Sequence, residues 1–196
     1  MKAMMMGLVL LAAPAFADAL KLGDKAPLAG TKMKNVDGTE VSITDIAGTK
    51  GALVIFSCNH CPFVKAWEGR IATLGNEYRD KGVGVIVINA NDPVAYAEDS
   101  LEEMQARAKK LGFKFPYAVD ATSDVARAFG ASKTPECFLF DAGGQLVYHG
   151  AVDDSKQGDV KEPYLKNAIE ALLAGKEVAV KETKFVGCGI KFRAKS

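Results

Sequence analysis

The fold is decided by the stretch Val54-Ile55-Phe56-Ser57-Cys58-Asn59-His60-Cys61-Pro62, in which a Cys-x-x-Cys pair lies where an apolar, strand-like run gives way to a helix-like segment. Two cysteines at this spacing share one face of a helix's first turn, so their sulfurs can form a disulfide with little backbone movement. The free N–H groups and the positive dipole end of a helix N-terminus favour a thiolate on Cys58. This placement indicates dithiol–disulfide exchange, in which Cys58 attacks and Cys61 resolves the mixed disulfide.

Two other uses of the cysteine pair stay open from the sequence: a structural disulfide, and half of a metal site. A structural zinc site usually needs a second such pair, and no second Cys-x-x-Cys occurs in the chain. His60, inside the motif, is expected to lower the pKa of Cys58 further through a partly protonated imidazole, which makes the couple more oxidising. The alternative for His60 is a solvent-facing helix residue without a role.

Residues 1–17 have the pattern of a cleaved secretory signal peptide. Lys2 precedes an apolar stretch from Gly7 to Ala13, and Ala15-Phe16-Ala17 matches an A-x-A cleavage site, so cleavage is expected after Ala17. The apolar stretch is shorter than the ~20 residues that span a bilayer, so no stable membrane anchor is expected after cleavage. The sequence therefore predicts a periplasmic or secreted protein, and an exported dithiol needs an electron donor or acceptor in order to turn over.

Length and composition are those of one globular domain, because the chain has 196 residues, of which 48% are hydrophobic and 25% charged. This domain is expected to span residues 18–196, including a basic tail at 176–196. The chain carries 25 Lys and Arg against 24 Asp and Glu, and loss of Lys2 with the signal peptide makes the mature chain neutral. A neutral balance argues against nucleic acid as a partner.

Apolar periodicity along the chain predicts an α/β protein. Residues 52–57 and 83–89 are continuous apolar runs typical of buried strands, and the helical spacing over 62–81 between them makes a βαβ unit. Before this unit, the turn at Asp37-Gly38 predicts an N-terminal hairpin, which is followed by a helical turn at 44–47. The elements expected after the unit are a helix at 98–111, a strand at 117–119, a helix at 123–129 with Ser123 as its N-cap, a hairpin at 136–149 and a helix at 163–173.

Five stretches spread over nearly the whole mature chain carry a family resemblance: Cys58–Lys65, Val87–Asp92, Phe115–Tyr117, Thr134–Glu136 and Val186–Lys191. Together they resemble the bacterial peroxiredoxin-like proteins of the redoxin group, which are related to alkyl hydroperoxide reductase and thiol-specific antioxidant proteins. The resemblance implies a thioredoxin-like fold with a central mixed β-sheet flanked by helices, an N-terminal β-hairpin extension and a C-terminal tail. It implies no organic cofactor and no metal. The partners expected are proteins with disulfides or dithiols, and a redox partner that the sequence does not identify.

The same resemblance gives Thr134 and Pro135 a role in binding. Only about 5–6% of X–Pro bonds in folded proteins are cis, but thioredoxin-like proteins carry a cis-proline at the start of the strand beside the Cys-x-x-Cys. The backbone before that proline helps to hold the partner's chain. The resemblance therefore implies a cis bond before Pro135 and a client-binding role for Thr134 and Pro135.

One departure from the family bears on the reaction. True peroxiredoxins place a Thr or Ser three residues before the attacking cysteine and a Pro four residues earlier still. Ile55 and Gly51 stand at these positions here, so the elements that hold peroxide are missing. The cysteine spacing instead resembles thioredoxins and the exported reductases of cytochrome c maturation. The function expected is that of an exported thiol–disulfide oxidoreductase, and weak thiol peroxidase activity is a lesser alternative.

A copper-binding chaperone of the Sco type is a second alternative. Soft thiolates suit Cu(I), and His60 or His149 could complete a site. Sco-type motifs have three residues between the cysteines, whereas this motif has two, which weakens the resemblance.

The other two cysteines are less informative. Cys137 follows Pro135 by two residues and is expected to be a small buried hydrophobe, with a thiol facing the dithiol as the alternative. Two arrangements stay open for Cys188: an exposed thiol in the tail, or a bridge to Cys137. The apolar residues of the tail that are available for docking are Val178, Val180, Phe185, Ile190 and Phe192.

Overall fold

The computed structural model describes residues 20–194, so the expected signal peptide at 1–17 lies outside the described residues. The centre of the molecule is a mixed β-sheet. Its strands are β1 (Met33–Asn35), β2 (Glu40–Val41), β3 (Gly51–Phe56), β4 (Val83–Asn89), β5 (Tyr117–Val119), β7 (Glu136–Asp141) and β8 (Leu146–Gly150). They form two hydrogen-bonded sets, in the orders β2-β1-β5-β4 and β3-β7-β8.

The two sets of strands meet at β3 and β4. The backbone N–H of Lys50 donates to the carbonyl of Gly82 at 3.0 Å, and that of Ser57 donates to the carbonyl of Ile88 at 2.9 Å, just beyond the two ends of β3. Strands β3 and β4 therefore run in parallel, as the predicted βαβ unit requires. Strand β4 also pairs with β5 in parallel, whereas the β1–β2, β1–β5, β3–β7 and β7–β8 pairs are antiparallel.

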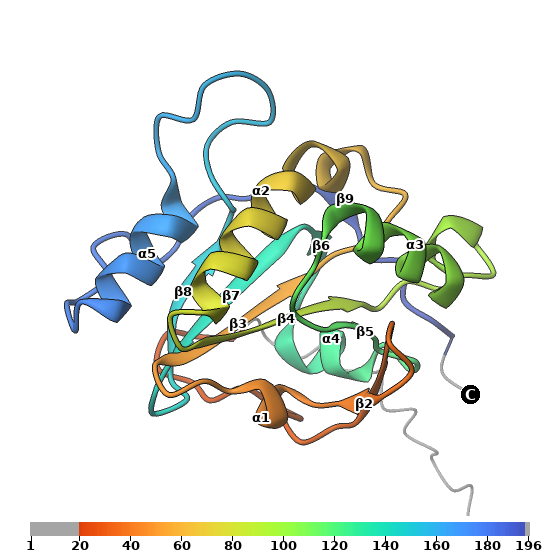
Figure 1. The fold of residues 1–196 in the computed structure, drawn as a ribbon, viewed down its shortest axis with the longest axis horizontal. Helices are drawn as coiled ribbons and strands as arrows, with labels where there is room; N and C mark the ends of the chain where they lie inside the picture. The colour runs from red at the N-terminus through yellow and green to blue at the C-terminus, as the bar shows by residue number, and fades with distance from the viewer. Residues whose placement is uncertain (1–19, 195–196) are drawn as a thin grey trace, which may run out of the picture.

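Helices cover both faces of the sheet (Figure 1). They are α1 (Ile43–Ile46), α2 (Pro62–Arg79), α3 (Leu101–Leu111), α4 (Asp124–Phe129) and α5 (Tyr164–Leu173). Side chains of β3 alternate between the faces: Leu53 and Ile55 join the apolar cluster under α2, α3 and α5, and Val54 and Phe56 join the cluster under α1 and α4. Burial on both faces explains why the sequence of β3 is apolar without interruption.

The helix expected at 98–111 begins at Leu101, three residues later than predicted. Ser100 is the N-cap, and its Oγ accepts a hydrogen bond from the backbone N–H of Glu103 at 3.3 Å. The residues before it, Ala97–Asp99, form a separate 3₁₀ turn, η1. The cap therefore divides one predicted helix into two elements.

Ser123 occupies the N-cap position of α4, as expected, but its hydroxyl is used elsewhere. The hydroxyl donates to the carbonyl of Ala90 at 2.7 Å. The carboxylate of Asp120 serves the start of the helix, where it accepts from the backbone N–H of Ala126 at 2.9 Å. The predicted capping by the Ser123 side chain is therefore wrong, because a carboxylate already occupies that place.

The tail is part of the fold. It first runs beside β8, where the backbone N–H of His149 donates to the carbonyl of Lys181 at 2.9 Å. It then forms the short strand β9 (Cys188–Gly189), which pairs antiparallel with β6 (Lys133–Thr134) (Figure 1). Val178 and Ile190 are buried as expected, whereas Val180 is 50% exposed, so its predicted docking is wrong.

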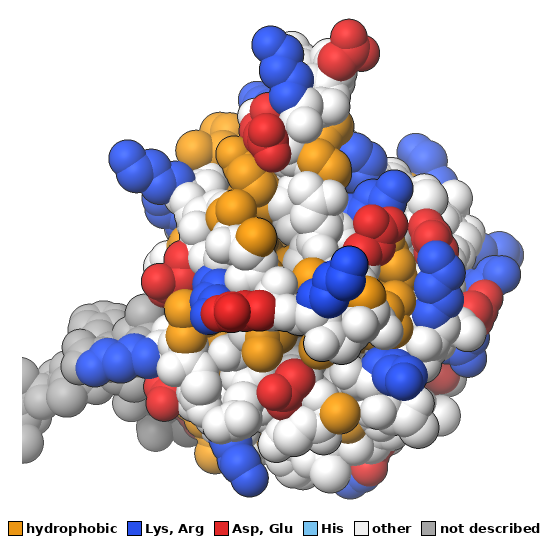
Figure 2. Space-filling view, turned by 90° about the vertical axis from the view of Figure 1, so that its left-hand side faces the viewer, with side chains coloured by type: hydrophobic (Ala, Val, Ile, Leu, Met, Phe, Trp, Pro, Cys, Tyr) orange, Lys and Arg blue, Asp and Glu red, His pale blue; other side chains and the backbone are white. Residues whose placement is uncertain are grey.

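Acidic and basic side chains are interspersed over the face shown in Figure 2, which agrees with the near-neutral charge of the chain. Among residues 20–194, none of the helices is both long enough and apolar enough to span a bilayer.

Candidate active site

The dithiol lies at the junction of β3 and α2, as the sequence predicts. Strand β3 ends at Phe56, Cys61 is the N-cap of α2, and Pro62 follows at the first helical position, where its missing N–H costs nothing. Both cysteines are buried, since Cys58 is 1% exposed and Cys61 0%. Neither thiol is therefore open to solvent, because other segments of the chain cover both.

One covering segment is β6 with the proline that follows it. The Thr134–Pro135 bond is cis, as the resemblance implies. Thr134 Oγ1 lies 3.2 Å from Cys58 Sγ, and Cys61 Sγ donates to the Thr134 carbonyl at 3.4 Å. Thr134 therefore contacts both thiols, one through its side chain and the other through its backbone.

The second covering segment is β9, which carries Cys188. The sulfurs of Cys188 and Cys61 lie 2.7 Å apart. Gly187 permits this approach, because a Cβ at that position would lie 2.3 Å from the carbonyl oxygen of Thr134. All four cysteines of the described residues are free thiols. The half-buried Cys188 thus lies against Cys61. This differs from both arrangements that the sequence left open for Cys188, an exposed thiol and a bridge to Cys137.

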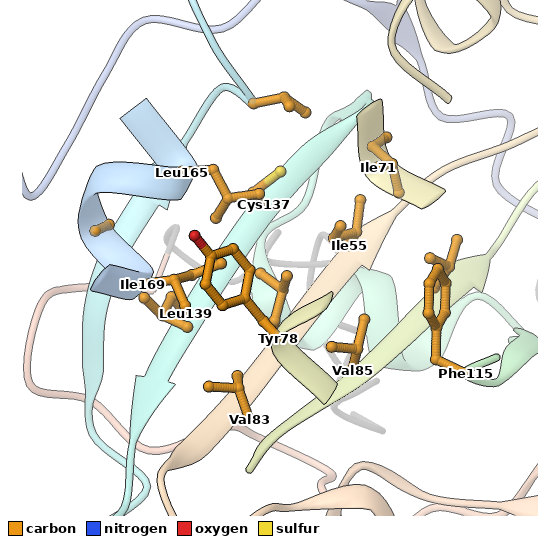
Figure 3. Packing of buried hydrophobic residues seen from close by; sticks show 14 of the residues in the cluster. Ile55, Ile71, Tyr78, Val83, Val85, Phe115, Cys137, Leu139, Leu165 and Ile169 are labelled. Carbon is orange, nitrogen blue, oxygen red and sulfur yellow. The ribbon is translucent and has the colours of Figure 1, made fainter. Parts of the chain in front are cut away.

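Cys137 belongs to the apolar core (Figure 3). It is fully buried, on the same face of the sheet as Ile55 and in one cluster with Leu165 of α5, and burial raises the pKa of its thiol. A cysteine buried among apolar side chains, with no thiol partner in contact, is structural and inert. The interpretation of Cys137 as a small buried hydrophobe is confirmed, and the alternative of a thiol facing the dithiol is wrong.

A buried carboxylate fixes the turn between the two cysteines of the motif. Asp99, which is 1% exposed, accepts hydrogen bonds from the backbone N–H of Asn59 at 2.6 Å and from the side-chain amide of Asn91 at 2.8 Å. The amide of Asn59 donates to the Glu98 carbonyl at 2.8 Å, and its oxygen accepts from the hydroxyl of Tyr117 at 3.1 Å. These contacts lock the backbone between Cys58 and Cys61.

His60 is held between Asp99 and Tyr96. Its Nδ1 lies 2.6 Å from Asp99 Oδ2, and its ring stacks on that of Tyr96 with centroids 4.0 Å apart. The side chain of His60 is only 10% exposed, so the interpretation of a solvent-facing residue is wrong. Potential ligand atoms of Cys58, His60 and Asp99 all lie within 4.8 Å of one another. The imidazole is therefore close enough to interact with the Cys58 thiol.

The pKa values of the two thiols of the motif are shifted in opposite directions. The neighbouring Cys61 thiol and burial raise the pKa of Cys58, and the charge of Asp99 acts in the same direction. The Cys58 thiol in turn lowers the pKa of Cys61, and Cys188 and the backbone amide of Val64 add to this effect. In this reduced arrangement the surroundings therefore raise the pKa of Cys58, whereas the sequence predicts that they lower it.

His149, which was the other candidate copper ligand, is engaged elsewhere. Its Nε2 lies 2.8 Å from Glu136 Oε1, and its ring stacks on Phe138. Among the described residues, the metal-ligating side chains that gather at the motif are those of Cys58, His60 and Asp99. A metal at the motif would therefore use His60 and not His149.

The two positions that peroxiredoxins use to hold peroxide serve the fold here. Ile55 is 1% exposed and points into the core on the same face as Ile71 and Val85 (Figure 3). Gly51 has φ +139°, and a Cβ there would lie 2.2 Å from the carbonyl of Phe140. Proline is excluded at Gly51, because its ring fixes φ near −65°.

Comparison with known proteins places the chain in a family. A family model described as Redoxin matches residues 21–169. The chain belongs to the redoxin family. A curated relative, the thiol-disulfide oxidoreductase ResA of Halalkalibacterium halodurans, is 25% identical to this redoxin over 115 residues, which are 59% of this chain and 61% of the relative. The match thus spans less than two thirds of that relative's length.

Solved structures agree with this assignment. A hypothetical protein from Sinorhizobium meliloti is 35% identical to this redoxin, with a TM-score of 0.84 over 91% of this chain and 98% of the other. A thioredoxin-like protein in its oxidised form is 21% identical, with a TM-score of 0.63 over 80% of this chain and 98% of the other. The redoxin therefore has the thioredoxin-like fold that the sequence predicts.

Sequence reasoning missed Asp99 and Asn91 in this redoxin, although Asn91 lies in a stretch that carries the resemblance. Periodicity assigned Asp99 to the first turn of an exposed helix, where an acidic residue is ordinary. A signal was present in the next residue, since a serine ahead of an apolar helix favours an N-cap at Ser100 and so leaves Asp99 outside the helix.

Proposed function

We propose that this redoxin is an exported thiol–disulfide oxidoreductase, which exchanges disulfides with protein clients through Cys58 and Cys61. The observation that carries the proposal is the contact of both thiols with Thr134, whose backbone continues into the cis-proline. The name of the relative from H. halodurans supports the same reaction. The reaction needs no organic cofactor, because the sulfur atoms themselves carry the two electrons.

In the reductive direction, the sulfur of Cys58 attacks a client disulfide. The client's S–S bond breaks, a mixed disulfide with Cys58 forms, and the other client sulfur leaves as a thiolate. The thiol of Cys58 gives up its proton in this step, against the contacts that raise its pKa. The client thiolate takes up that proton. Cys61 then gives up its own proton and attacks the sulfur of Cys58, the bond between Cys58 and the client breaks, and the second client sulfur takes up a proton, so the client leaves as a dithiol. Two electrons have passed to the client.

Client binding is assigned to the segment at Thr134 and Pro135. Pro135 lines a cavity of about 290 Å³ together with Trp67 and Phe185, beside the covered dithiol. Charged side chains of Asp153, Asp154, Lys156 and Lys184 also line this cavity, so it suits an extended chain that carries both apolar and charged side chains. His60 and Asp99 hold the motif and tune the reactivity of Cys58.

Export is part of the proposal. The signal-peptide pattern of residues 1–17 would deliver the protein to the periplasm or outside the cell, as one domain that spans residues 18–196. Clients and the partner that restores the dithiol would then be proteins outside the cytoplasm. An oxidising compartment supplies disulfides for such an exchange.

Replacement of the resolving cysteine tests the proposal. With Cys61→Ser, a mixed disulfide between Cys58 and a disulfide-containing client protein cannot be resolved at the motif and should accumulate. The complex is detected by non-reducing electrophoresis and mapped by mass spectrometry. Cys137→Ala in the same background should still capture the client, because Cys137 lies in the core, whereas Cys58→Ser should abolish capture. Absence of a mixed disulfide on Cys58 would show that this mechanism is wrong.

A further inference from the structure

We infer that Cys188 is a third redox-active cysteine, which exchanges with the Cys58–Cys61 disulfide to form a Cys61–Cys188 disulfide. The inference deepens the proposed function and rests on it. The sulfurs of Cys61 and Cys188 already lie 2.7 Å apart, and a disulfide bond is about 2.05 Å long. A small rotation of the two side chains is enough to close this gap.

The fold fixes Cys188 at this place. In the β6–β9 ladder Thr134 is paired with Cys188 and Lys133 with Gly189. One step further on, the backbone N–H of Ile190 donates to the carbonyl of Ser132 at 3.0 Å. The close approach that Gly187 permits belongs to the same ladder, so the strand register itself sets the sulfur of Cys188 against Cys61.

The tail and the active-site turn share one hydrogen-bond network. The side-chain oxygen of Asn91 accepts from the backbone N–H of Lys191 at 2.7 Å, and its amide donates to Asp99 at 2.8 Å. Asp99 in turn holds Asn59 and His60 of the motif. The chain thus ties the segment after Cys188 to the turn that carries the dithiol.

The exchange step balances without any outside reagent. Cys188 gives up its proton and attacks the sulfur of Cys61, the Cys58–Cys61 bond breaks, and the Cys61–Cys188 bond forms. Cys58 leaves as a thiolate and takes up a proton, so the protein neither gains nor loses electrons. Burial and the neighbouring Cys61 thiol raise the pKa of Cys188 in the reduced protein. The second of these causes is removed once Cys61 is in a disulfide with Cys58.

The exchange moves the disulfide to a cysteine that is more exposed than the two of the motif. Cys58 and Cys61 are 1% and 0% exposed, whereas Cys188 is half-buried and lies in the tail. A protein dithiol that restores the enzyme can therefore reach Cys188 more readily than the motif. Transfer of the disulfide to Cys61–Cys188 frees the thiol of Cys58 and brings the bond to be reduced nearer to solvent.

In the Cys58→Ser variant, Cys61 and Cys188 can form a disulfide without competition from Cys58. The variant is oxidised with diamide, quenched with acid, alkylated and digested with trypsin, which releases Cys61 in fragment 51–65 and Cys188 in fragment 185–191. The expected result is a disulfide-linked pair of these two fragments. Alkylation of both cysteines after oxidation would overturn the inference. In oxidised wild-type protein the same linked pair is expected beside the internal disulfide of fragment 51–65, so the test does not depend on the variant alone.

Two glycines of the tail supply matched variants in the Cys58→Ser background. Gly187→Ala drives a Cβ into the Thr134 carbonyl, so the tail shifts and the linked pair is lost. Gly189→Ala meets its nearest atom at 3.9 Å, so the linked pair is kept. Circular dichroism checks that both variants fold. Equal yields of the linked pair in two folded variants would overturn the inference.

The client-capture experiment and the linked-fragment experiment test the proposed function and the role of Cys188 separately. If Cys61→Ser captures clients on Cys58 while oxidised Cys58→Ser shows no linked pair, only the role of Cys188 is wrong. If the linked pair forms and no client is captured, the proposed function is wrong.

Discussion

Asp99 contributes both geometry and charge to the dithiol. Its two oxygens fix Asn59, His60 and Asn91 around the motif. Its negative charge lies close to Cys58 in a site buried from solvent, and there charges interact more strongly than at the surface. The carboxylate therefore opposes a thiolate on Cys58 and helps to hold the pKa of Cys58 above its usual value.

Removal of this charge should lower the pKa of Cys58. In Asp99→Asn an amide of the same shape can still accept from Asn59, but the negative charge that raises the Cys58 pKa is gone. The pH profile of Cys58 alkylation, read by site-resolved mass spectrometry, should shift to lower pH. Glu98→Gln is the matched control, because that carboxylate is exposed and lies 3.5 Å from Lys65. A shift to higher pH in Asp99→Asn would contradict this account of the site.

The residues of the site were predictable where they form local motifs. Cys58 and Cys61 stand out because of their spacing, and Thr134 and Pro135 because of the family resemblance. Asp99 and the contact of Cys188 with Cys61 did not stand out, since each depends on segments that meet only in the folded chain. The direction of the pKa shift of Cys58 was mispredicted for the same reason, because the buried charge of Asp99 comes from another segment of the chain.

At the scale of elements, the cap of α3 decides where Asp99 lies. The Ser100 hydroxyl accepts from Glu103 N–H and so starts the helix one residue after itself. An earlier start would draw Asp99 into the helix and away from the motif. The position of a single N-cap thus connects the helix boundary to the geometry of the dithiol.

Loss of this cap should destabilise the protein. Ser100→Ala removes the acceptor for Glu103 and should lower the free energy of unfolding by about 1 kcal/mol, as measured by urea denaturation. Ser100→Asp keeps an acceptor at the N-cap and should restore most of that loss. Equal destabilisation by the two variants would mean that the hydroxyl does not act as a cap.

The βαβ unit and β5 were predicted well, whereas β6 and β9 were not. Strands β4 and β5 have the predicted bounds, and β3 and α2 differ by one or two residues at their ends, because apolar periodicity is a local property of the chain. Strands β6 and β9 have two residues each, which is too few for a periodic signal. Their pairing depends instead on Gly187. The lack of a Cβ at this residue matters only in the folded chain, where Thr134 lies against it.

At the scale of the whole molecule, three remote segments converge on one place. The motif follows β3, Thr134 lies in β6, and Cys188 lies in the tail that pairs with β6 (Figure 1). The sheet fixes the first two segments, and the ladder between β6 and β9 fixes the third. The result is a dithiol covered by its own chain, with one further thiol between it and the solvent.

The measurement that tests the central claim most directly is a redox titration of the Cys58–Cys61 pair. Cys188→Ser protein is equilibrated in glutathione buffers, alkylated and digested, and the internal disulfide of fragment 51–65 is quantified. The account predicts one two-electron transition between about −120 and about −270 mV, the range of dithiol oxidoreductases. A fragment that stays fully alkylated across this range would contradict it.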